Sequence, residues 1–145
     1  MKKYLILLSL FLFTLPSFAG GVGYINYEKV VDNYNFAKTS MHEIQVKERE
    51  VSEYLKKKEE EFNKLETPIQ RKKFEETVRA ELQIKEKTFN EFRNSREEQV
   101  YSRIHAVAEK IRLEKGLDVL IDARGVFSGG VDITDALIQK LNQNK

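Results

Sequence analysis

The chain has 145 residues, of which 33% are charged, with 25 lysines and arginines against 23 aspartates and glutamates. It has no cysteine, which excludes a disulfide framework and a thiolate metal site. The formal net charge is only +2, so no strong overall field favours nucleic acid as a partner.

The first 19 residues have the pattern of a secretory signal peptide. Two lysines precede an apolar run from 4 to 15, and residues 17–19 (Ser-Phe-Ala) form a small-x-small cleavage site before Gly20. The run is too short to cross roughly 30 Å of hydrocarbon, although an uncleaved signal anchor is the alternative. We expect a mature chain from Gly20 that has lost two lysines, leaving 23 basic and 23 acidic residues and a net charge of zero.

Residues 20–35 predict the first piece of a small base. Residues 21–26 (Gly-Val-Gly-Tyr-Ile-Asn) are typical of a short strand that opens with glycines. Residues 27–34 carry valine and tyrosine at helical spacing, which indicates a short helix before the central part of the chain.

Residues 36–115 predict a long helical hairpin arm. This stretch has no glycine, no aspartate and one proline, with nineteen lysines and arginines and seventeen glutamates, a composition that favours exposed helix. We expect its first helix over 37–65, about 40 Å long. Glu48 and Lys58 interrupt a coiled-coil-like seam of alternating three-four spacing, whose apolar members are Met41, Ile44, Val51, Leu55, Phe62 and Leu65.

The turn at the arm tip is predicted at 66–68. Thr67 suits an N-cap, Pro68 the first helical position and Gln70 the third, and together they form a capping box. A second helix is therefore expected from Pro68 to the end of the arm. Its apolar stripe is interrupted at Arg96, which we interpret as the point where the arm enters the base.

Residues 116–145 predict the second piece of the base. The sequence Leu-Asp-Val-Leu-Ile-Asp at 117–122 is typical of a buried strand, and Val-Phe-Ser at 126–128 indicates another. With a turn between them, the two strands are expected to form a hairpin. Thr134 suits the cap of a last helix at 135–142.

The predicted fold class is α+β, with the arm dividing one base into residues 20–35 and 116–145. The two pieces hold 46 residues, which is too few to bury an adequate core alone. The arm adds little, because a two-helix hairpin buries only one stripe on each helix. We therefore expect an obligate oligomer in which short strands from several chains share a barrel or sheet.

Residues able to carry catalysis or to hold a metal are scarce and scattered. His42 and His105 fall on different helices without a third ligand at metal spacing, so we expect both to be surface or seam residues. Ser128 has no histidine partner that the sequence can supply, and the adjacent glutamates at 59–61 would point in different directions on a helix. We expect no enzymatic activity, no cofactor and no metal.

The arm tip combines apolar and basic side chains. Between residues 56 and 73, seven basic residues stand against four acidic ones, a net charge of +3. Such a surface suits an extended apolar chain or an anionic lipid head group, although the apolar residues could simply close the hairpin. The candidate binding residues are Phe62, Leu65, Ile69, Phe74, Lys56, Lys57, Lys58, Arg71, Lys72 and Lys73.

The order of these features resembles the Skp/OmpH family of periplasmic chaperones. The resemblance spans the mature chain and is most specific at 116–141, GLDVLIDARGVFSGGVDITDALIQKL. It implies a homotrimer with a common barrel and three arms, acting as an ATP-independent holdase for unfolded outer-membrane proteins. The best-known members are strongly basic and attract lipopolysaccharide, an attraction that this neutral chain would keep only at the tip. The oligomerisation residues would be Tyr24, Ile25, Val119, Leu120, Ile121, Val126 and Phe127.

The alternative is a structural or adaptor coiled-coil protein of the cell envelope, whose arms pair with the arms of a fixed partner. A continuous apolar seam would favour that alternative. Polar residues on or near the seams instead favour loose arms that bind weakly at many places: Glu48, Lys58, Lys85 and Arg96.

Overall fold

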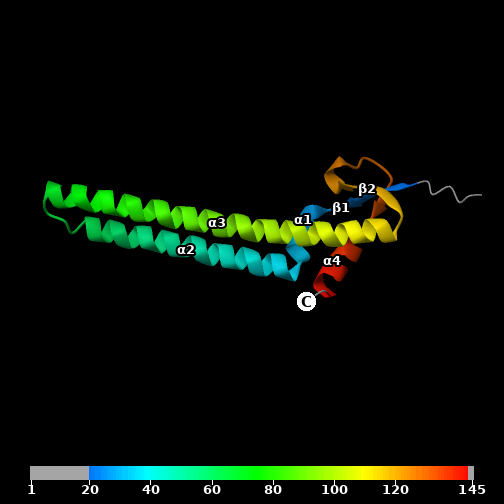
Figure 1. Ribbon diagram of the computed structural model, residues 1–145, viewed down its shortest axis with the longest axis horizontal. Helices are drawn as coiled ribbons and strands as arrows, with labels where there is room; N and C mark the ends of the chain where they lie inside the picture. Colours follow the sequence, from blue (N-terminus) through cyan, green and yellow to red (C-terminus); the bar gives the residue numbers. More distant parts are fainter. Residues whose placement is uncertain (1–19, 144–145) are drawn as a thin grey trace, which may run out of the picture.

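The computed structural model describes residues 20–143, so the predicted signal peptide, 1–19, lies outside the described residues. The elements are β1 (Gly21–Ile25), α1 (Tyr27–Asn33), α2 (Asn35–Phe62), α3 (Pro68–Glu114), β2 (Leu117–Asp122), the short 3-10 helix η1 (Ala123–Gly125), β3 (Val131–Asp132) and α4 (Thr134–Gln143). Figure 1 shows α2 and α3 side by side as a long arm, with the other elements gathered at one end as the base. The predicted α+β fold with a helical hairpin arm is confirmed. None of the described helices combines the length and the apolar character needed to cross a bilayer.

The turn at the arm tip is longer than predicted. Helix α2 ends at Phe62. The N–H of Asn63 still donates to the carbonyl four residues back (3.0 Å), but those of Lys64 and Leu65 donate to carbonyls three residues back (3.2 and 3.0 Å). This tighter pattern closes a helix. The turn therefore spans 63–67 and not 66–68.

The start of α3 is as predicted. Gln70 N donates to Thr67 Oγ1 (3.3 Å), and Thr67 N donates to Gln70 Oε1 (3.2 Å), with Pro68 in the first helical position. This capping box satisfies backbone N–H groups that a helix start would otherwise leave free. The signal is local, so it fixes where the chain re-enters a helix after the turn.

The sheet of the base differs from the predicted hairpin. Its three strands are all parallel in the order β2-β1-β3, and residues 126–128 are not a strand. The third strand lies later, at β3, where Ile133 N donates to Tyr24 O (3.0 Å). The hairpin prediction is therefore wrong, because β2 pairs with the distant β1 and not with the segment that follows it.

Two local features carry the chain from β2 past β1 to the other edge of the sheet. Directly after β2, Asp122 Oδ1 accepts from Arg124 N (2.9 Å) and turns the backbone into η1. Gly129 and Gly130 then adopt φ values of 80° and 91°, which glycine tolerates far better than other residues. The two glycines thus let the backbone turn toward the far edge of the sheet.

A bulge in β2 decides which of its side chains face the helices. The register with β1 shifts so that Asp118 has no partner residue. Because of this extra residue, Leu117 and Leu120 face the same side although they are three positions apart. Gly23 lies against both: a Cβ there would come within 2.7 and 2.5 Å of their Cδ atoms, so a larger residue would force both leucine side chains to shift.

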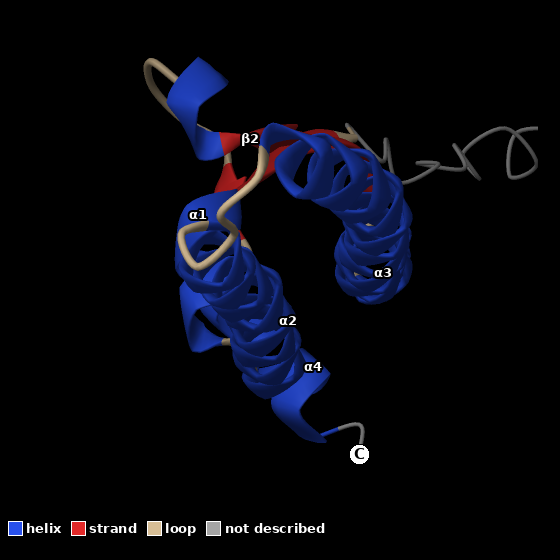
Figure 2. Ribbon diagram, turned by 90° about the vertical axis from the view of Figure 1, so that its left-hand side faces the viewer, coloured by secondary structure: helices blue, strands red, loops and turns tan. Residues whose placement is uncertain are grey.

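The core lies between the sheet and the helices of the base. Figure 2 shows the long helices on one side of the strands. All buried residues of α3 lie beyond Arg96, which confirms that the interrupted stripe marks the entry of the arm into the base. The buried core residues are Val30, Tyr34, Ala37, Val100, Ile104, Ala108, Ile111, Leu117, Ile133, Leu137 and Leu141.

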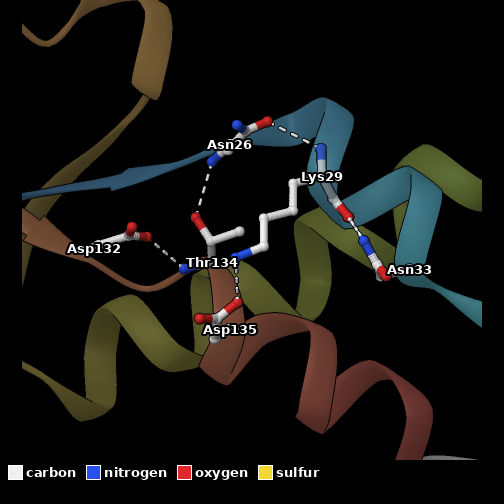
Figure 3. Close-up of polar contacts among 6 residues, drawn as sticks. All are labelled: Asn26, Lys29, Asn33, Asp132, Thr134 and Asp135. Atoms are coloured by element: carbon white, nitrogen blue, oxygen red, sulfur yellow. Dashed lines mark hydrogen bonds and ion pairs between the residues drawn. The ribbon is translucent and has the colours of Figure 1, made fainter.

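Polar contacts join the two pieces of the base that are distant in sequence (Figure 3). Asn26 N donates to Thr134 Oγ1 (2.9 Å), while Asn26 Oδ1 accepts from Lys29 N (2.9 Å) at the start of α1. Lys29 Nζ also pairs with Asp135 Oδ1 (2.7 Å). Asp132 Oδ1 accepts from Thr134 N (2.8 Å), and the hydrogen bonds from Thr134 lower the pKa of Asp132. Thr134 therefore begins α4 as a buried residue, and Asp132 takes the capping role that the sequence suggested for Thr134.

The core makes a direct prediction for stability. Leu137 is 0% exposed, so Leu137→Ala should lower the free energy of unfolding by about 2–5 kcal/mol through lost burial and the cavity left behind. Leu113→Ala, at a position that is 64% exposed, should change it by less than about 0.5 kcal/mol. Urea unfolding followed by circular dichroism measures both, and equal losses would contradict this placement of the core.

Candidate functional site

The arm beyond the base buries none of its side chains. From residue 45 to residue 99, every side chain of α2, the tip and α3 is exposed or only half-buried. The reason is geometric: each apolar stripe of a two-helix hairpin has a single neighbouring helix to cover it. Apolar surface along the arm therefore stays within reach of another molecule, and we take this surface as the candidate functional site.

At the tip, the structure brings four of the predicted binding residues into one cluster. The rings of Phe62 and Phe74 lie 6.2 Å apart, centroid to centroid, at 45°. Lys58 Nζ lies 5.5 Å from the centroid of Phe74, and the guanidinium of Arg71 lies 5.5 Å from that of Phe62. Each such cation–π contact contributes about 0.5–1 kcal/mol at an exposed site. These four residues hold the two helices together at the tip while both rings remain half-exposed.

Lys58 also forms an ion pair within the tip. Its Nζ lies 2.8 Å from Glu61 Oε2, and this hydrogen bond lowers the pKa of Glu61 and raises that of Lys58. Solvent screens the pair, so it orients Lys58 over the ring more than it stabilises the fold.

The other predicted tip residues do not join this cluster. Ile69 is 83% exposed in the first turn of α3. Leu65 is half-buried in the turn, where its carbonyl accepts from Arg71 Nε (3.0 Å). The other predicted basic residues, Lys56, Lys57, Lys72 and Lys73, are all exposed, and the last two lie about one helical turn after Ile69 on α3.

Two hollows along the arm adjoin at Leu55 and form one apolar groove, which we call groove A. The hollow nearer the tip has a volume of about 420 Å³ and lies between Phe62 on α2 and Val78 on α3. The hollow nearer the base has a volume of about 360 Å³ and lies between Val51 and Phe89. Groove A is open to solvent, so a chain segment could lie in it without any movement of the helices.

Polar contacts across the arm replace a buried core. Tyr54 Oη donates a short hydrogen bond to Glu81 Oε2, and Lys85 Nζ lies 4.6 Å from the centroid of the Tyr54 ring. Partial desolvation and the hydrogen bond to Glu81 raise the pKa of Tyr54 to about 12. The sequence alone does not pair Tyr54 with Glu81, because 27 residues and the register of the two helices separate them.

A second polar contact marks the junction of arm and base. Arg96 Nη2 lies 2.7 Å from Glu43 Oε2, an ion pair without the angles of a hydrogen bond. The same guanidinium lies 5.4 Å from the centroid of the Phe92 ring. Arg96, which interrupts the apolar stripe in the sequence, is therefore the residue that connects α3 to α2 where the buried core ends.

The outer face of the sheet is the second exposed apolar surface. Val119 and Ile121, both predicted for oligomerisation, are exposed on β2, and Val22 is exposed on β1. Phe127 lies in the loop after η1 and is 106% exposed, as open to solvent as in an unfolded chain. A hollow of about 610 Å³ lies between this loop and the strands.

The remaining oligomerisation candidates are less exposed. Ile25 and Leu120 pack against the core of their own chain. Tyr24 and Val126 are half-buried. The structure thus divides the predicted set into residues that build the base and residues that its exposed face offers to a partner.

The base holds polar side chains near β2, but they are already engaged with one another. Arg112 pairs with Glu109 (2.6 Å) and donates to the carbonyl of Leu117 (2.7 Å), which fixes the guanidinium at the edge of the sheet. His105 is exposed and stacks on Tyr101 at 5.9 Å, and His42 is exposed on α2. Within residues 20–143, no three potential metal ligands gather in one place.

The contact between Tyr54 and Glu81 can be tested by titration. Spectrophotometric titration should show one tyrosine that ionises near pH 12, and Glu81→Gln should lower that pKa because the carboxylate acceptor is lost. Glu76→Gln removes the same charge at a position away from Tyr54, so this variant should leave the raised pKa of Tyr54 unchanged. Because the folded pKa lies above 10.0, any stability from this bond is present below pH 10.0 and is lost as the pH rises toward 12. If no tyrosine of the wild-type chain ionises near pH 12, the two helices do not meet at this register.

Comparison with known proteins agrees with this architecture. The profile of a family described as outer membrane protein (OmpH-like) matches residues 21–141. A solved structure from Caulobacter crescentus is described as a candidate outer membrane chaperone (OmpH-like). It superposes with a TM-score of 0.61 and covers 87% of this chain and 86% of that chain. The two sequences are 14% identical, so the likeness concerns the fold. No curated protein gives a significant match. Because the profile spans nearly all of the described residues, the chain belongs to the OmpH-like outer membrane protein family.

Proposed function

We propose that the mature chain is a periplasmic holdase chaperone that binds unfolded outer-membrane proteins between its arms and prevents their aggregation without ATP. The observation that carries this proposal is the arm itself, which exposes apolar stripes that its own chain does not bury. Membership of the OmpH-like family supports a role with outer membrane proteins, and the matching Caulobacter structure is described as a candidate chaperone.

The physical chemistry of the arm suits an unfolded client. Groove A and the tip offer shallow apolar patches separated by long charged side chains, so many different segments can make weak contacts. Several arms on one base would multiply these contacts through effective concentration. Release then needs only the loss of a few contacts at a time, which explains why no nucleotide is required in this scheme.

An adaptor that pairs with one fixed partner is less well supported. Lys58 and Lys85 occupy or flank the seam, and their ammonium groups lie over the Tyr54 ring at 5.7 and 4.6 Å. A dedicated coiled-coil partner would have to displace these contacts or leave them in its interface. Contacts of this kind favour an adaptable surface over a fixed seam.

We further propose that the chain assembles as a homotrimer through the outer face of the sheet. Exposed apolar residues on β1, β2 and the loop at Phe127 are the kind of surface that another copy would cover. Strand β2 also lies at an edge of the sheet, where its unpaired backbone groups can accept a further strand. The number three comes from the family resemblance, whereas the exposed face supports only the existence of an interface.

The basic tip suits anionic groups in the same compartment. Exposed lysines lie about one helical turn from Ile69 on α3, and the tip segment carries a net charge of +3, so anionic lipid or lipopolysaccharide is proposed as a second ligand there. The location in the periplasm depends on cleavage of the predicted signal peptide before Gly20.

A refolding assay tests the holdase. An unfolded β-barrel outer-membrane protein diluted into buffer should scatter less light when the mature chain is in molar excess. Phe62→Glu with Leu65→Glu should weaken client binding by about tenfold, because charge replaces two apolar contacts. Leu113→Glu with Gln143→Glu adds the same charge to the exposed surface of the base and should bind as the wild type does.

Two results would count against this proposal. Unchanged aggregation in the presence of excess wild-type chain contradicts the holdase itself. Unchanged affinity of the tip variant, with its helix content intact, would reduce Phe62 and Leu65 to residues that close the hairpin.

Sedimentation velocity tests the assembly. Ile121→Asp with Phe127→Asp should shift the wild-type oligomer toward monomer, because two charges would enter an apolar interface. Gln45→Asp with Gln83→Asp places the same charges on the arm and should leave the oligomer intact. A wild-type chain that sediments as a folded monomer in dilute solution would contradict assembly through the sheet.

A further inference from the structure

Groove A is lined by carboxylates that have no partner in their own chain. Elsewhere on the arm, Glu50 pairs with Lys47 and Glu61 pairs with Lys58, both at 2.8 Å. Four glutamates that line groove A make no ion pair and no side-chain hydrogen bond with any residue of 20–143: Glu48, Glu59, Glu75 and Glu86. An apolar groove with unpartnered negative charge along its walls is complementary to an occupant that is both apolar and positively charged.

The spacing of these carboxylates sets the size of the occupant. Glu48 and Glu59 on α2 are separated by eleven positions, as are Glu75 and Glu86 on α3. Eleven residues make about three helical turns, so each pair lies on one face with its members roughly 16 Å apart along the axis. An extended polypeptide covers that distance with about five residues, at about 3.3 Å each.

The floor of groove A favours the same kind of occupant. Its aromatic rings already accept cations from their own chain: besides the two contacts at the tip, the guanidinium of Arg93 lies 5.6 Å from the centroid of Phe89. Lysine or arginine of an incoming segment could therefore find both a carboxylate and a ring face. Of the residues that line groove A, two are basic, Lys58 and Arg79, and Lys58 is paired with Glu61. Arg71 and Arg93 lie over two of the floor rings, so an incoming cation would replace or share their ring contacts while it pairs with a carboxylate.

We propose that groove A selects extended client segments in which about five mainly apolar residues are flanked by lysine or arginine. The apolar centre would rest on Leu55 and the neighbouring rings, and the flanking cations would pair with the carboxylates on the two walls. This inference rests on the proposed chaperone function and names the chemistry of the segments that the arm holds. It also gives the arm two opposite preferences, since the tip carries a net charge of +3.

Fluorescent peptides test the selection directly. Three peptides share the centre Leu-Ser-Phe-Ser-Leu and carry two lysines, two glutamines or two glutamates on each side. Anisotropy titration with the mature chain at low salt should give the lysine peptide about tenfold tighter binding than the glutamate peptide, because the lysines pair with the four carboxylates and the glutamates are repelled by them. The preference should shrink as added salt screens the charges.

Matched variants locate the effect. The fourfold variant Glu48→Gln, Glu59→Gln, Glu75→Gln and Glu86→Gln should bind the three peptides nearly equally. A control with the same change of net charge, at exposed glutamates that do not line groove A, should keep the preference: Glu53→Gln, Glu60→Gln, Glu76→Gln and Glu91→Gln. Circular dichroism confirms that both variants keep their helices.

Three outcomes would overturn the proposal. The wild-type chain could bind the glutamate peptide as tightly as the lysine peptide, or the two fourfold variants could lose the preference equally. In the third outcome no peptide binds saturably and the groove-A variant sediments as a smaller species, which would mean that the arm of a second copy fills groove A. The refolding assay keeps the two proposals apart: a chain that suppresses aggregation without charge preference loses only this inference, whereas failure to suppress aggregation contradicts the holdase.

Discussion

A helix in a two-helix hairpin has only one neighbour, and this limit shapes the whole molecule. Beyond the base, neither α2 nor α3 can bury a side chain fully, and none is buried from residue 45 to residue 99. Isolated helices gain little stability in water without tertiary packing, so the arm must draw its stability from elsewhere. Its sources are strong helix formers, the capping box at Thr67, and the anchoring of α3 in the core of the base. The same limit leaves apolar surface exposed, so the structural weakness of the arm and its capacity to bind have one cause.

Helix α3 is the element that connects these two roles. It runs without interruption for 47 residues, and its last four turns supply four core residues, while the rest forms one side of the arm. The ion pair of Arg96 with Glu43 lies where the two environments meet. Binding on the arm can therefore change contacts there without loosening the core, since the core contacts begin only at Val100. Under the proposed holdase function, the arm could adapt to clients of variable shape while the core of the base stays packed.

Local signals were sufficient to predict the arm but not the sheet. The Thr67-Pro68-Gln70 signal acts over four residues, so composition and spacing locate the start of α3 correctly. Strand pairing depends on contacts across the whole arm: β1 meets β2 about one hundred residues away, and nothing near 126–128 indicates that β3 lies further on. The tip cluster of Phe62 and Phe74 follows from the predicted turn, whereas the pairing of Tyr54 with Glu81 needs the register of the two helices. The sequence does not show which glutamates line groove A either, because only the register of the hairpin brings its two walls together.

The near balance of 25 basic and 23 acidic residues in the full sequence coexists with a local separation of charge along the arm. Tip and groove A carry opposite excess charge, and α2 is about 40 Å long. The two sites adjoin, because Lys58, Phe62 and Phe74 belong to the tip cluster and also line groove A. With a Debye length of about 8 Å at physiological ionic strength, only the end of groove A nearer the base is screened from the tip. A strongly basic arm would attract every anionic segment along its length. Under the proposed function, an arm whose nineteen basic and seventeen acidic residues nearly balance would instead attract an anionic group at the tip and a cationic, apolar segment at groove A. Under the proposed function, a near balance of charge would make selection depend on the order of charged and apolar residues within the client and not on the client's overall charge.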